Sequence, residues 1–242
     1  MASATPRTRH ARTLFSGLGG DYDRWSSVLS FGQDPRWRRF LVDRRPALPG
    51  DHVLDVATGT GLVARTLARR YGCWVTGIDQ SPEMLAGARE RLARDPVAGP
   101  LVTLVEGRAE ELPFANATFD GLTCTYLLRY VDDPQAAVHE LVRTVKPGRP
   151  ISYLDFALPP RGPLRLAWDV YTGVGLPAAG RVISPAWYEV GRFLRGSIRR
   201  FCAEYDSDGL IRLFINAGVQ DAQVRRMSLG GGVVVWGRRD AG

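Results

Sequence analysis

The chain has 242 residues, of which 45% are hydrophobic, and its 32 Lys and Arg against 25 Asp and Glu give a formal net charge of +7. This length and composition suit one domain with a single sizeable core. No apolar run approaches the ~18 residues that span a bilayer, and residues 1–15 lack the hydrophobic centre of a secretion signal, which argues against a membrane-spanning or secreted protein. We therefore expect a cytoplasmic protein.

Arginine supplies almost all of the positive charge, because Lys146 is the only lysine. Such a balance can favour nucleic acid, an anionic membrane surface or an acidic small molecule. The arginines are dispersed over several predicted helices, however, so a solvated coat is the simpler interpretation. We expect no metal site, because the cysteines lie far apart without a CxxC spacing and no histidine is well placed.

The N-terminal region divides into two parts. Residues 1–12 are polar and lack periodicity, and we predict a disordered arm there. From residue 13 to 45, apolar and aromatic residues recur at broadly helical spacing, interrupted at Gly32 to Pro35. This second part is predicted to form helices that precede and cover the rest of the domain, which extends over 13–242.

Strand and helix patterns then alternate along the chain. The predicted strand–helix pairs are HVLDVA (52–57) with LVARTLARRYG (62–72), CWVTGID (73–79) with SPEMLAGARERLA (81–93), and FDGLTCTYLL (119–128) with PQAAVHELVRTVKPG (134–148). Two further strands are LVTLVEG (101–107), before a short turn, and PISYLDF (150–156), before an insertion. Such alternation indicates a doubly wound α/β fold with parallel strands and crossover helices.

Residues 159–203 break this alternation. Their prolines, glycines and aromatics predict helices and a long loop laid across the sheet as a lid insertion. A helix (DGLIRLFINAG, 208–218) follows, and then two strands (AQVRRMSL, 222–229, and GVVVWGRR, 232–239) joined through Gly230 to Gly232. The two strands predict a hairpin.

The stretch HVLDVATGTGL (52–62) ends a buried strand in a loop with almost no side chains. The loop satisfies the pattern G-x-G-x-x-G/A from Gly59 to Ala64, and Asp79 lies about 20 residues on, where a ribose-binding acid is expected. A nicotinamide dehydrogenase therefore fits the loop. Against it, the Tyr-x-x-x-Lys pair of a short-chain dehydrogenase is missing, since position 142, four before the only lysine, is valine, and the chain is too short for a second domain.

Asp55 favours S-adenosylmethionine instead, because it is an acid inside the strand just before the glycines. This cofactor carries no phosphate and presents an ammonium, a sulfonium and a ribose diol. Asp55 can balance the cationic amino-acid part, directly or by ordering the loop, while Asp79 accepts hydrogen bonds from both ribose hydroxyls. The structural alternatives are a capping acid at Asp55 and a turn residue at Asp79.

From these motifs outward, the chain resembles the class I methyltransferases and, within them, the ubiquinone/menaquinone-biosynthesis C-methyltransferase family. LFSGLGGDYDRWSSVLSFGQDPRWRRFLVD (14–43) is similar to that family's succession of YD, SFG or SLG, and WRR. The family's third and fourth strands resemble GRAEELPFANATFDGLTCTYLLRYVDDPQAAVHELVRTVKPG (107–148), and the arginine that follows its strand four corresponds to Arg129. Its strand five, lid helix and last strand resemble YLDF, SPAWYEVGRFLRGSI and SLGGGVVVWGRR, in that order. The resemblance implies a seven-stranded Rossmann-like sheet ending in an antiparallel hairpin, and methyl transfer from S-adenosylmethionine.

Three positions depart from that family's pattern. The Asn of its YDxxN segment is Ser26, the last residue of its LRN triplet is Tyr130, and the acid before Ala-Glu in its adenine segment is Arg108. Arginine cannot accept a hydrogen bond from the adenine amino group, so we expect the base to rest on backbone groups near Ala109 and on packing by Met84. These departures leave the substrate open. The predicted cofactor contacts are Asp55, Ala57, Thr58, Gly59, Gly61, Asp79, Gln80, Met84, Arg108, Ala109 and Tyr126.

Catalysis is expected to consist mostly of alignment in a water-poor cleft, because positive charge disperses as a sulfonium gives up its methyl group. If the acceptor is a ring carbon of a quinol, ionisation of the adjacent phenol, whose pKa is about 10, makes that carbon nucleophilic. Arg129 is predicted to stabilise the phenolate. Asp155, Tyr22, Asp23 and Tyr126 are candidates for the proton acceptor. For the tyrosines the alternative is a packed aromatic, and for Asp155 a turn or capping acid.

An apolar stripe crosses the predicted lid, formed by Phe193, Leu194, Ile198 and Phe201 among arginines at 192, 195, 199 and 200. Two interpretations are open. The stripe is a lid that rests on an anionic membrane surface and draws a prenylated quinone from it, or it is one side of a helix packed on the sheet with solvated arginines around it.

Three functions follow. The first is C-methylation of a prenylated quinol such as demethylmenaquinol, with contact to the membrane surface left open. The second is a tailoring methyltransferase that acts on carbon or oxygen of a polyketide-like or other small aromatic acceptor. The third, an RNA methyltransferase or nucleic-acid binder, is disfavoured, because TYLLRYV (125–131) lacks the Asn-Pro-Pro-aromatic run that resembles base-amine methylation. We therefore expect a small-molecule aromatic partner and no nucleic acid.

Overall fold

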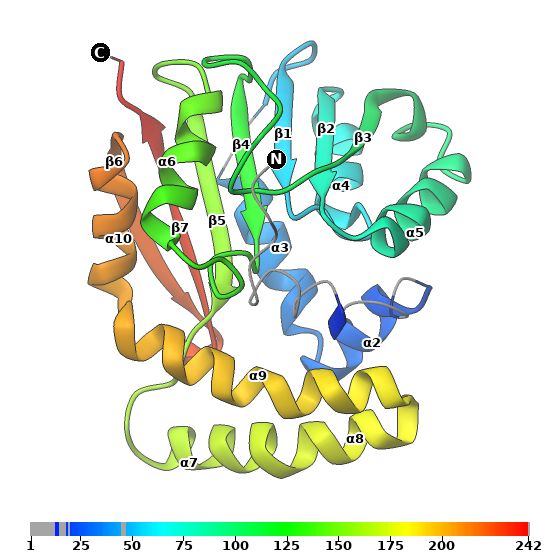
Figure 1. Cartoon of the computed structure of the whole chain (residues 1–242), viewed down its shortest axis with the longest axis vertical. Coiled ribbons are helices and arrows are strands. Elements are labelled where there is room, and N and C mark those ends of the chain that lie inside the picture. The colour runs from blue at the N-terminus through cyan, green and yellow to red at the C-terminus, as the bar shows by residue number, and fades with distance from the viewer. Residues whose placement is uncertain (1–12, 15–17, 19, 45–46, 242) are drawn as a thin grey trace.

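A seven-stranded sheet forms the centre of the structure, a computed structural model that describes residues 13–14, 18, 20–44 and 47–241 (Figure 1). The strand order is β3-β2-β1-β4-β5-β7-β6. The strands are β1 His52–Val56, β2 Trp74–Asp79, β3 Val102–Glu106, β4 Gly121–Thr125, β5 Pro150–Phe156, β6 Val219–Met227 and β7 Gly232–Arg239. The first five pair in parallel, and β7 is antiparallel to both β5 and β6. The predicted sheet with its antiparallel C-terminal hairpin is confirmed, whereas the predicted arm at 1–12 lies outside the described residues.

Helices precede the sheet and fill its connections. They are α2 Tyr22–Leu29, α3 Gln33–Asp43, α4 Leu62–Tyr71, α5 Pro82–Ala93, α6 Pro134–Thr144 and α10 Ser207–Asn216. The hydroxyl of Ser81 caps α5 by accepting a hydrogen bond from the Met84 N–H at 3.2 Å, and Pro82 begins the helix. The predicted interruption near residue 32 is narrower than expected, because α3 begins directly after Gly32 and Pro35 fits its first turn, where an N–H has no helical partner.

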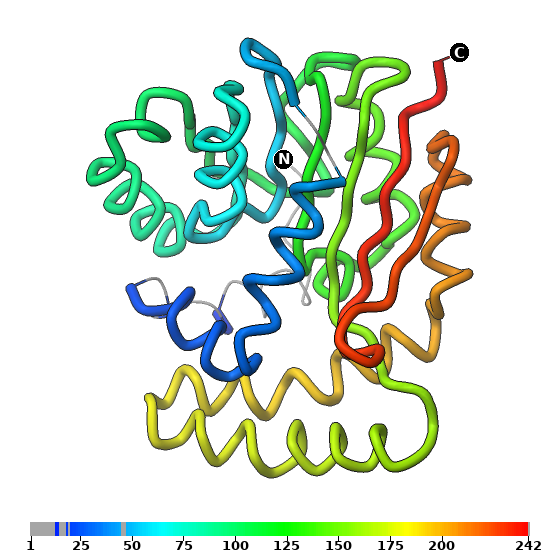
Figure 2. The backbone as a smooth tube through the Cα atoms, turned by 180° about the vertical axis from the view of Figure 1, so that it is seen from behind, coloured from blue at the N-terminus to red at the C-terminus, as the bar shows by residue number. Residues whose placement is uncertain are grey.

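The sheet carries an apolar core on each face. Val53 and Leu54 of β1 show why, since successive residues of a strand point to opposite faces. Leu54 belongs to the core that α6 and α10 cover, and Val53 to the core that α3 and α4 cover, as the front and back views show (Figure 1, Figure 2). Both are fully buried. Cover on both faces of the parallel part explains why its central strands β1 and β4 are almost wholly buried.

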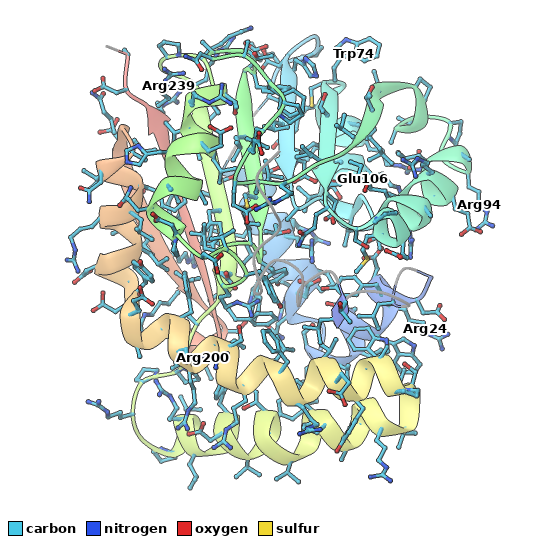
Figure 3. All side chains as sticks on the ribbon, viewed as in Figure 1. Arg24, Trp74, Arg94, Glu106, Arg200 and Arg239 are labelled. Carbon is cyan, nitrogen blue, oxygen red and sulfur yellow. The ribbon has the colours of Figure 1, made fainter. Side chains whose placement is uncertain are left out.

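Residues 163–204 form a helical layer at one end of the sheet. The layer consists of α7 Pro163–Val170, a π-helical segment Tyr171–Gly175, α8 Leu176–Ile183 and α9 Pro185–Glu204. Helix α9 lies between the sheet and the outer pair α7–α8 (Figure 1, Figure 2). Arg200 on α9 and Trp74 at the start of β2 lie at opposite ends of the sheet (Figure 3). Helix α9 thus faces the carboxyl ends of the parallel strands, where ligands bind in sheets of this kind.

Within the described ranges, no helix is long and apolar enough to cross a bilayer. The same residues contain no group of three or more His, Cys, Asp or Glu side chains that could hold a metal ion. Cys73 and Cys124 are buried free thiols, and Cys202 is a half-buried one.

Candidate active site

A cavity opens at the carboxyl ends of β1, β2 and β4 and contains about 880 Å³ of empty space, its open mouth included. It gathers most of the predicted site residues, namely Tyr22, Ala57, Thr58, Gly59, Asp79, Gln80, Met84, Ala109 and Tyr126. The predicted residues that do not line it are Asp55, Gly61, Arg108, Arg129 and Asp155. Arg38, Glu110 and Tyr130 also line it, and the sequence analysis did not predict a role for them.

Asp79 and the glycine loop bind each other where β1 and β2 end. The Gly59 N–H donates to Asp79 Oδ2 at 2.8 Å, and the Ser81 N–H donates to Asp79 Oδ1 at 2.9 Å. Gly59 has φ of 55°, and a Cβ built there would meet no atom within 4 Å, so it would take up the open space in front of the loop. Burial raises the pKa of Asp79, against the effect of these N–H donors. A carboxylate beside a bare loop fits a ribose diol, so these residues suit an adenosyl cofactor.

Asp55 lies beneath the loop rather than in the cavity wall. Its carboxylate is fully buried and accepts hydrogen bonds from the hydroxyls of Thr58, at 2.6 Å, and Thr123, at 2.7 Å. Thr58 lines the cavity, whereas Asp55 does not. Of the two roles predicted for Asp55, this geometry favours ordering of the loop.

Asp55 gives a first testable prediction, on stability and pH. Burial raises its pKa from 3.8 to about 6, although the two threonine hydroxyls oppose the shift. The folded chain therefore binds this proton more tightly than the unfolded chain does, so the stabilisation is complete below about pH 4 and is lost as the pH rises through about 6. We expect the free energy of unfolding of the wild type, relative to Asp55→Asn, to fall by ~2 kcal/mol between pH 4 and pH 7 in urea titrations. A difference that stays constant over this range would contradict the assignment.

Two strained residues stand at adjacent strand ends. Ala57, after β1, and Tyr126, after β4, have left-handed backbones with φ of 55° and 58°, and both line the cavity. For non-glycine residues this conformation costs on the order of 1 kcal/mol each, and such strain concentrates where a ligand is bound. No feature of the sequence signals it.

Helix α2 is tied to the glycine loop by Asp23, which the sequence analysis considered as a proton acceptor. The Thr60 hydroxyl donates to Asp23 Oδ1 at 2.6 Å, and Arg91 Nε lies 3.3 Å from Asp23 Oδ2. These contacts bring the neighbouring Tyr22 into the cavity wall. Burial raises the pKa of Tyr22 well above its usual value, so its hydroxyl is protonated at neutral pH. Asp23 therefore positions the cover helix.

Aromatic pairs join the cavity to α9. The rings of Tyr22 and Trp187 stack with centroids 5.7 Å apart, and those of Tyr130 and Phe193 stack at 5.8 Å. The stripe predicted on this helix faces inward, since Ile198 is 2% exposed and the other three members are buried or half-buried. Of its two interpretations, the structure shows the helix packed on the core.

Arg129 and Asp155 pair with each other instead of facing the cavity. Arg129 Nε donates to Asp155 Oδ1 at 2.6 Å, and the two side chains are 1% and 0% exposed. Arg129 Nη1 also donates to Ser197 Oγ on α9 at 3.3 Å. The structure therefore does not bring these residues to the acceptor as the sequence analysis expected, and their catalytic roles stay predictions.

Glu110 brings a carboxylate to the side of the cavity where we predicted the adenine. It lies next to Ala109, and Arg108 Nη2 is 3.4 Å from its Oε1. Although Arg108 cannot accept a hydrogen bond from an adenine amino group, the carboxylate of Glu110, two residues further on, is of a type that can. The sequence signal for Glu110 is the Ala-Glu pair at 109–110, from which only backbone contacts to the base are predicted.

Comparisons with known proteins agree with this geometry. Residues 4–238 match the model of the ubiE/COQ5 methyltransferase family. The chain is 35% identical to a ubiquinone/menaquinone biosynthesis C-methyltransferase of Desulfotalea psychrophila, over 93% of this chain and 88% of the relative. It is 37% identical to a demethylmenaquinone methyltransferase of Renibacterium salmoninarum, over 96% of this chain and 92% of that relative.

Among solved structures, a geranyl diphosphate C-methyltransferase of Streptomyces coelicolor, in complex with S-adenosyl-L-homocysteine, aligns over 98% of this chain and 100% of its own, with a TM-score of 0.66 and 14% identity. That likeness supports the fold, and the family match gives the chemistry. The chain therefore belongs to the ubiE/COQ5 methyltransferase family and is an S-adenosylmethionine-dependent methyltransferase of the class I fold.

Proposed function

We propose that the chain methylates a ring carbon of a prenylated quinol such as demethylmenaquinol. The observation that carries this proposal is the aromatic end of the cavity, where Tyr22 and Tyr130 line the wall and Trp187 and Phe193 of α9 stack on them. Flat aromatic walls suit a flat aromatic acceptor. The names of the two curated relatives support the same acceptor class.

The chain's own contribution to the reaction is alignment and exclusion of water. Bound S-adenosylmethionine supplies the methyl group. The predicted proton acceptors are engaged elsewhere, since Tyr22 is held protonated, Tyr126 donates its hydroxyl to Asp34, and Asp155 is paired with Arg129. A covered wall is then the main source of rate enhancement, because it holds the acceptor carbon in line with the methyl group and keeps water out during the transfer. The ring carbon loses one proton as it gains the methyl group, and this proton passes to solvent when the site opens to release the product.

The test of this function is transfer of a labelled methyl group. Purified protein is incubated with methyl-labelled S-adenosylmethionine and either demethylmenaquinol in lipid micelles or a soluble dihydroxynaphthalene, and the products are identified by mass spectrometry. We expect label on the ring carbon of the quinol. Label on the soluble acceptor with none on the quinol would contradict the proposal.

A tailoring methyltransferase is the second candidate function. Tyr130 favours it, because it stands where the related family carries Asn and brings an additional ring into the cavity wall. An additional ring in the wall suits a polyketide-like aromatic acceptor as well as a quinol head. O-methylation of such an acceptor, in the same assay, is the result that would establish this function.

The outer helices carry an exposed apolar surface that suits contact with a membrane. Its residues are Leu164, Leu166, Val170, Val174 and Val182, which are between 47% and 88% exposed. They belong to α7, the π-helical segment and α8, on the layer outside α9 (Figure 1). Exposed Arg161 lies two residues before α7 and exposed Arg181 lies on α8, and arginines beside an apolar face favour anionic lipid. We infer that this surface, rather than the α9 stripe, meets the bilayer that holds the quinol.

Vesicle binding checks this surface. The double variant Leu166→Asp, Val182→Asp is expected to weaken co-sedimentation with phosphatidylglycerol-containing vesicles by roughly tenfold or more, because it removes two apolar side chains from the contact. Val97→Asp changes an equally apolar, 53% exposed residue in the α5–β3 connection and serves as the control. Equal binding by both variants and the wild type would show that α7 and α8 do not touch lipid.

A further inference from the structure

The charged residues in the cavity wall are unequal in sign. Among the described residues that line it, Arg38 is the one cation, and Asp79 and Glu110 are anions. The cofactor of this family carries two positive groups, a sulfonium and an ammonium, and a single carboxylate. A wall with one fixed cation therefore matches a ligand with one fixed anion.

Arg38 is held in place by one edge of its guanidinium. Its side chain is 10% exposed, and Nε donates to both oxygens of Asp34 at 3.0 and 2.9 Å. Within the described part of the chain, no acceptor is hydrogen-bonded to either terminal nitrogen of Arg38. A guanidinium presents its donors as a fork that matches a carboxylate, and here the outer part of the fork has no protein partner although the residue lines the cavity.

Asp34 and Tyr126 fix this fork from two elements. The Tyr126 hydroxyl donates to Asp34 Oδ1 at 2.5 Å, and the Arg38 guanidinium carbon lies 5.1 Å from the centre of the Tyr126 ring. Tyr126 is itself anchored after β4, where its N–H donates to Leu154 O at 2.8 Å. A cation held in this way is already ordered before it meets a ligand, which reduces the entropic cost of binding.

The chemistry of Arg38 favours a permanent anion. Burial alone would lower the pKa of Arg38, but the adjacent Asp34 carboxylate holds it above its usual value, so the guanidinium stays charged. The carboxylate of an amino acid is ionised throughout the neutral range, whereas a phenol with a pKa of about 10 is mostly neutral there. A permanently charged fork is therefore matched better by the cofactor's carboxylate than by the acceptor's hydroxyl.

We propose that the terminal nitrogens of Arg38 bind the carboxylate of the amino-acid part of S-adenosylmethionine, and that Asp34 and Tyr126 are positioning residues for Arg38. The assignment concerns the cofactor alone and is independent of the acceptor. It also gives α3 a function in ligand binding, in addition to its packing on the sheet.

A ligand that lacks only the carboxylate tests the proposal. Calorimetry measures the dissociation constants of S-adenosylmethionine and decarboxylated S-adenosylmethionine for the wild type, Arg38→Gln and the control Arg39→Gln, which removes an equal charge from the exposed neighbour on α3. We expect Arg38→Gln to weaken binding of S-adenosylmethionine by about 10- to 100-fold and to leave binding of the decarboxylated ligand within about twofold. Arg39→Gln should behave like the wild type with both ligands.

The double variant Arg38→Gln, Asp34→Asn guards against a folding artefact, because it avoids leaving the Asp34 carboxylate buried without its cation. It is expected to show the same selective loss. If Arg38→Gln raises the dissociation constants of both ligands by the same factor, Arg38 supports the shape of the site without contacting the carboxylate, and the proposal is wrong. If neither dissociation constant changes but the KM of the methyl acceptor rises, Arg38 binds the acceptor instead of the cofactor, and the proposal is again wrong.

Discussion

Replacing Asp79 with alanine is expected to raise the dissociation constant of S-adenosylmethionine by ~100-fold or more while the chain remains folded. Two ribose hydroxyls that donate to one carboxylate make two charge-assisted hydrogen bonds, at about 1.5 kcal/mol each or more. The substitution also removes the acceptor of the Gly59 N–H, which holds the loop against β2. Both effects act on the cofactor, and titration calorimetry measures their sum.

Glu106→Ala is the matched control for Asp79→Ala. Glu106 ends β3 directly opposite Asp79 in the parallel register, and its side chain is exposed (Figure 3). The substitution Glu106→Ala therefore removes the same charge from the same edge of the sheet. Glu106 does not line the cavity, and we expect wild-type affinity. An Asp79→Ala protein that binds within about threefold of the wild type would show that this carboxylate does not hold the ribose.

Arg129→Ala is expected to cost the fold about 3–5 kcal/mol of stability, because it leaves Asp155 as an uncompensated charge in the core. Asp155 is fully buried, and its remaining donors are the Tyr153 hydroxyl and the Phe156 N–H, neither of which carries a positive charge. Urea denaturation measures the loss. Since Arg129 does not line the cavity, the dissociation constant of the cofactor should change by less than about threefold at temperatures where the variant is folded.

The double variant Arg129→Met, Asp155→Asn separates this pair from other effects. With neither charge left in the core, most of the lost stability should return, because replacing both members of a buried pair is far less costly than removing one. If the double variant loses as much unfolding free energy as the two single variants lose together, the residues are not coupled. The predicted stabilisation of a phenolate by Arg129 requires this pair to open, since Asp155 and Ser197 occupy its donors in the structure.

The type of each element and its place along the chain could be predicted from local patterns, whereas the order of the strands in the sheet could not. Apolar runs such as 52–56 and 150–156 are long enough for strands buried on both faces, and each is followed by residues that start or stop a helix, such as Ser81. Parallel strands with crossover helices then follow from the rule that such connections are right-handed and short. The hairpin at residues 219–239 follows from its glycines. None of this requires knowledge of distant contacts.

The partners of the charged side chains could not be predicted in the same way. Asp34 and Tyr126 are 92 positions apart, and Arg129 and Asp155 are 26 apart, so no spacing rule connects them. A motif shows that Arg129 follows a strand at the sheet's edge, but it does not show that a neighbouring strand supplies a carboxylate. Arg38 belongs to the WRR motif, but the motif does not show that its side chain lines the cavity, and the motif position of Arg129 predicts a place at the cavity that the structure gives to Arg38 instead.

The lid shows a related limit. Helical spacing identified the apolar stripe on α9 correctly, because the period of 3.6 residues is a property of the segment. The residues that cover this stripe are distant from it in the sequence, such as Tyr130, which stacks on Phe193, and Tyr22 in the same apolar cluster, so the local pattern does not include them. The exposure of Leu166 and Val182 likewise depends on how α7, α8 and α9 pack together, which the local pattern does not show.

A crystal structure with S-adenosylhomocysteine bound tests the central claim most directly, because it shows which protein atoms each part of the ligand meets. We expect the ribose hydroxyls on Asp79, the carboxylate on the terminal nitrogens of Arg38, and the thioether sulfur turned toward Tyr22 and Tyr130. A ribose held away from Asp79, or a sulfur that faces away from the aromatic end of the cavity, would contradict the account.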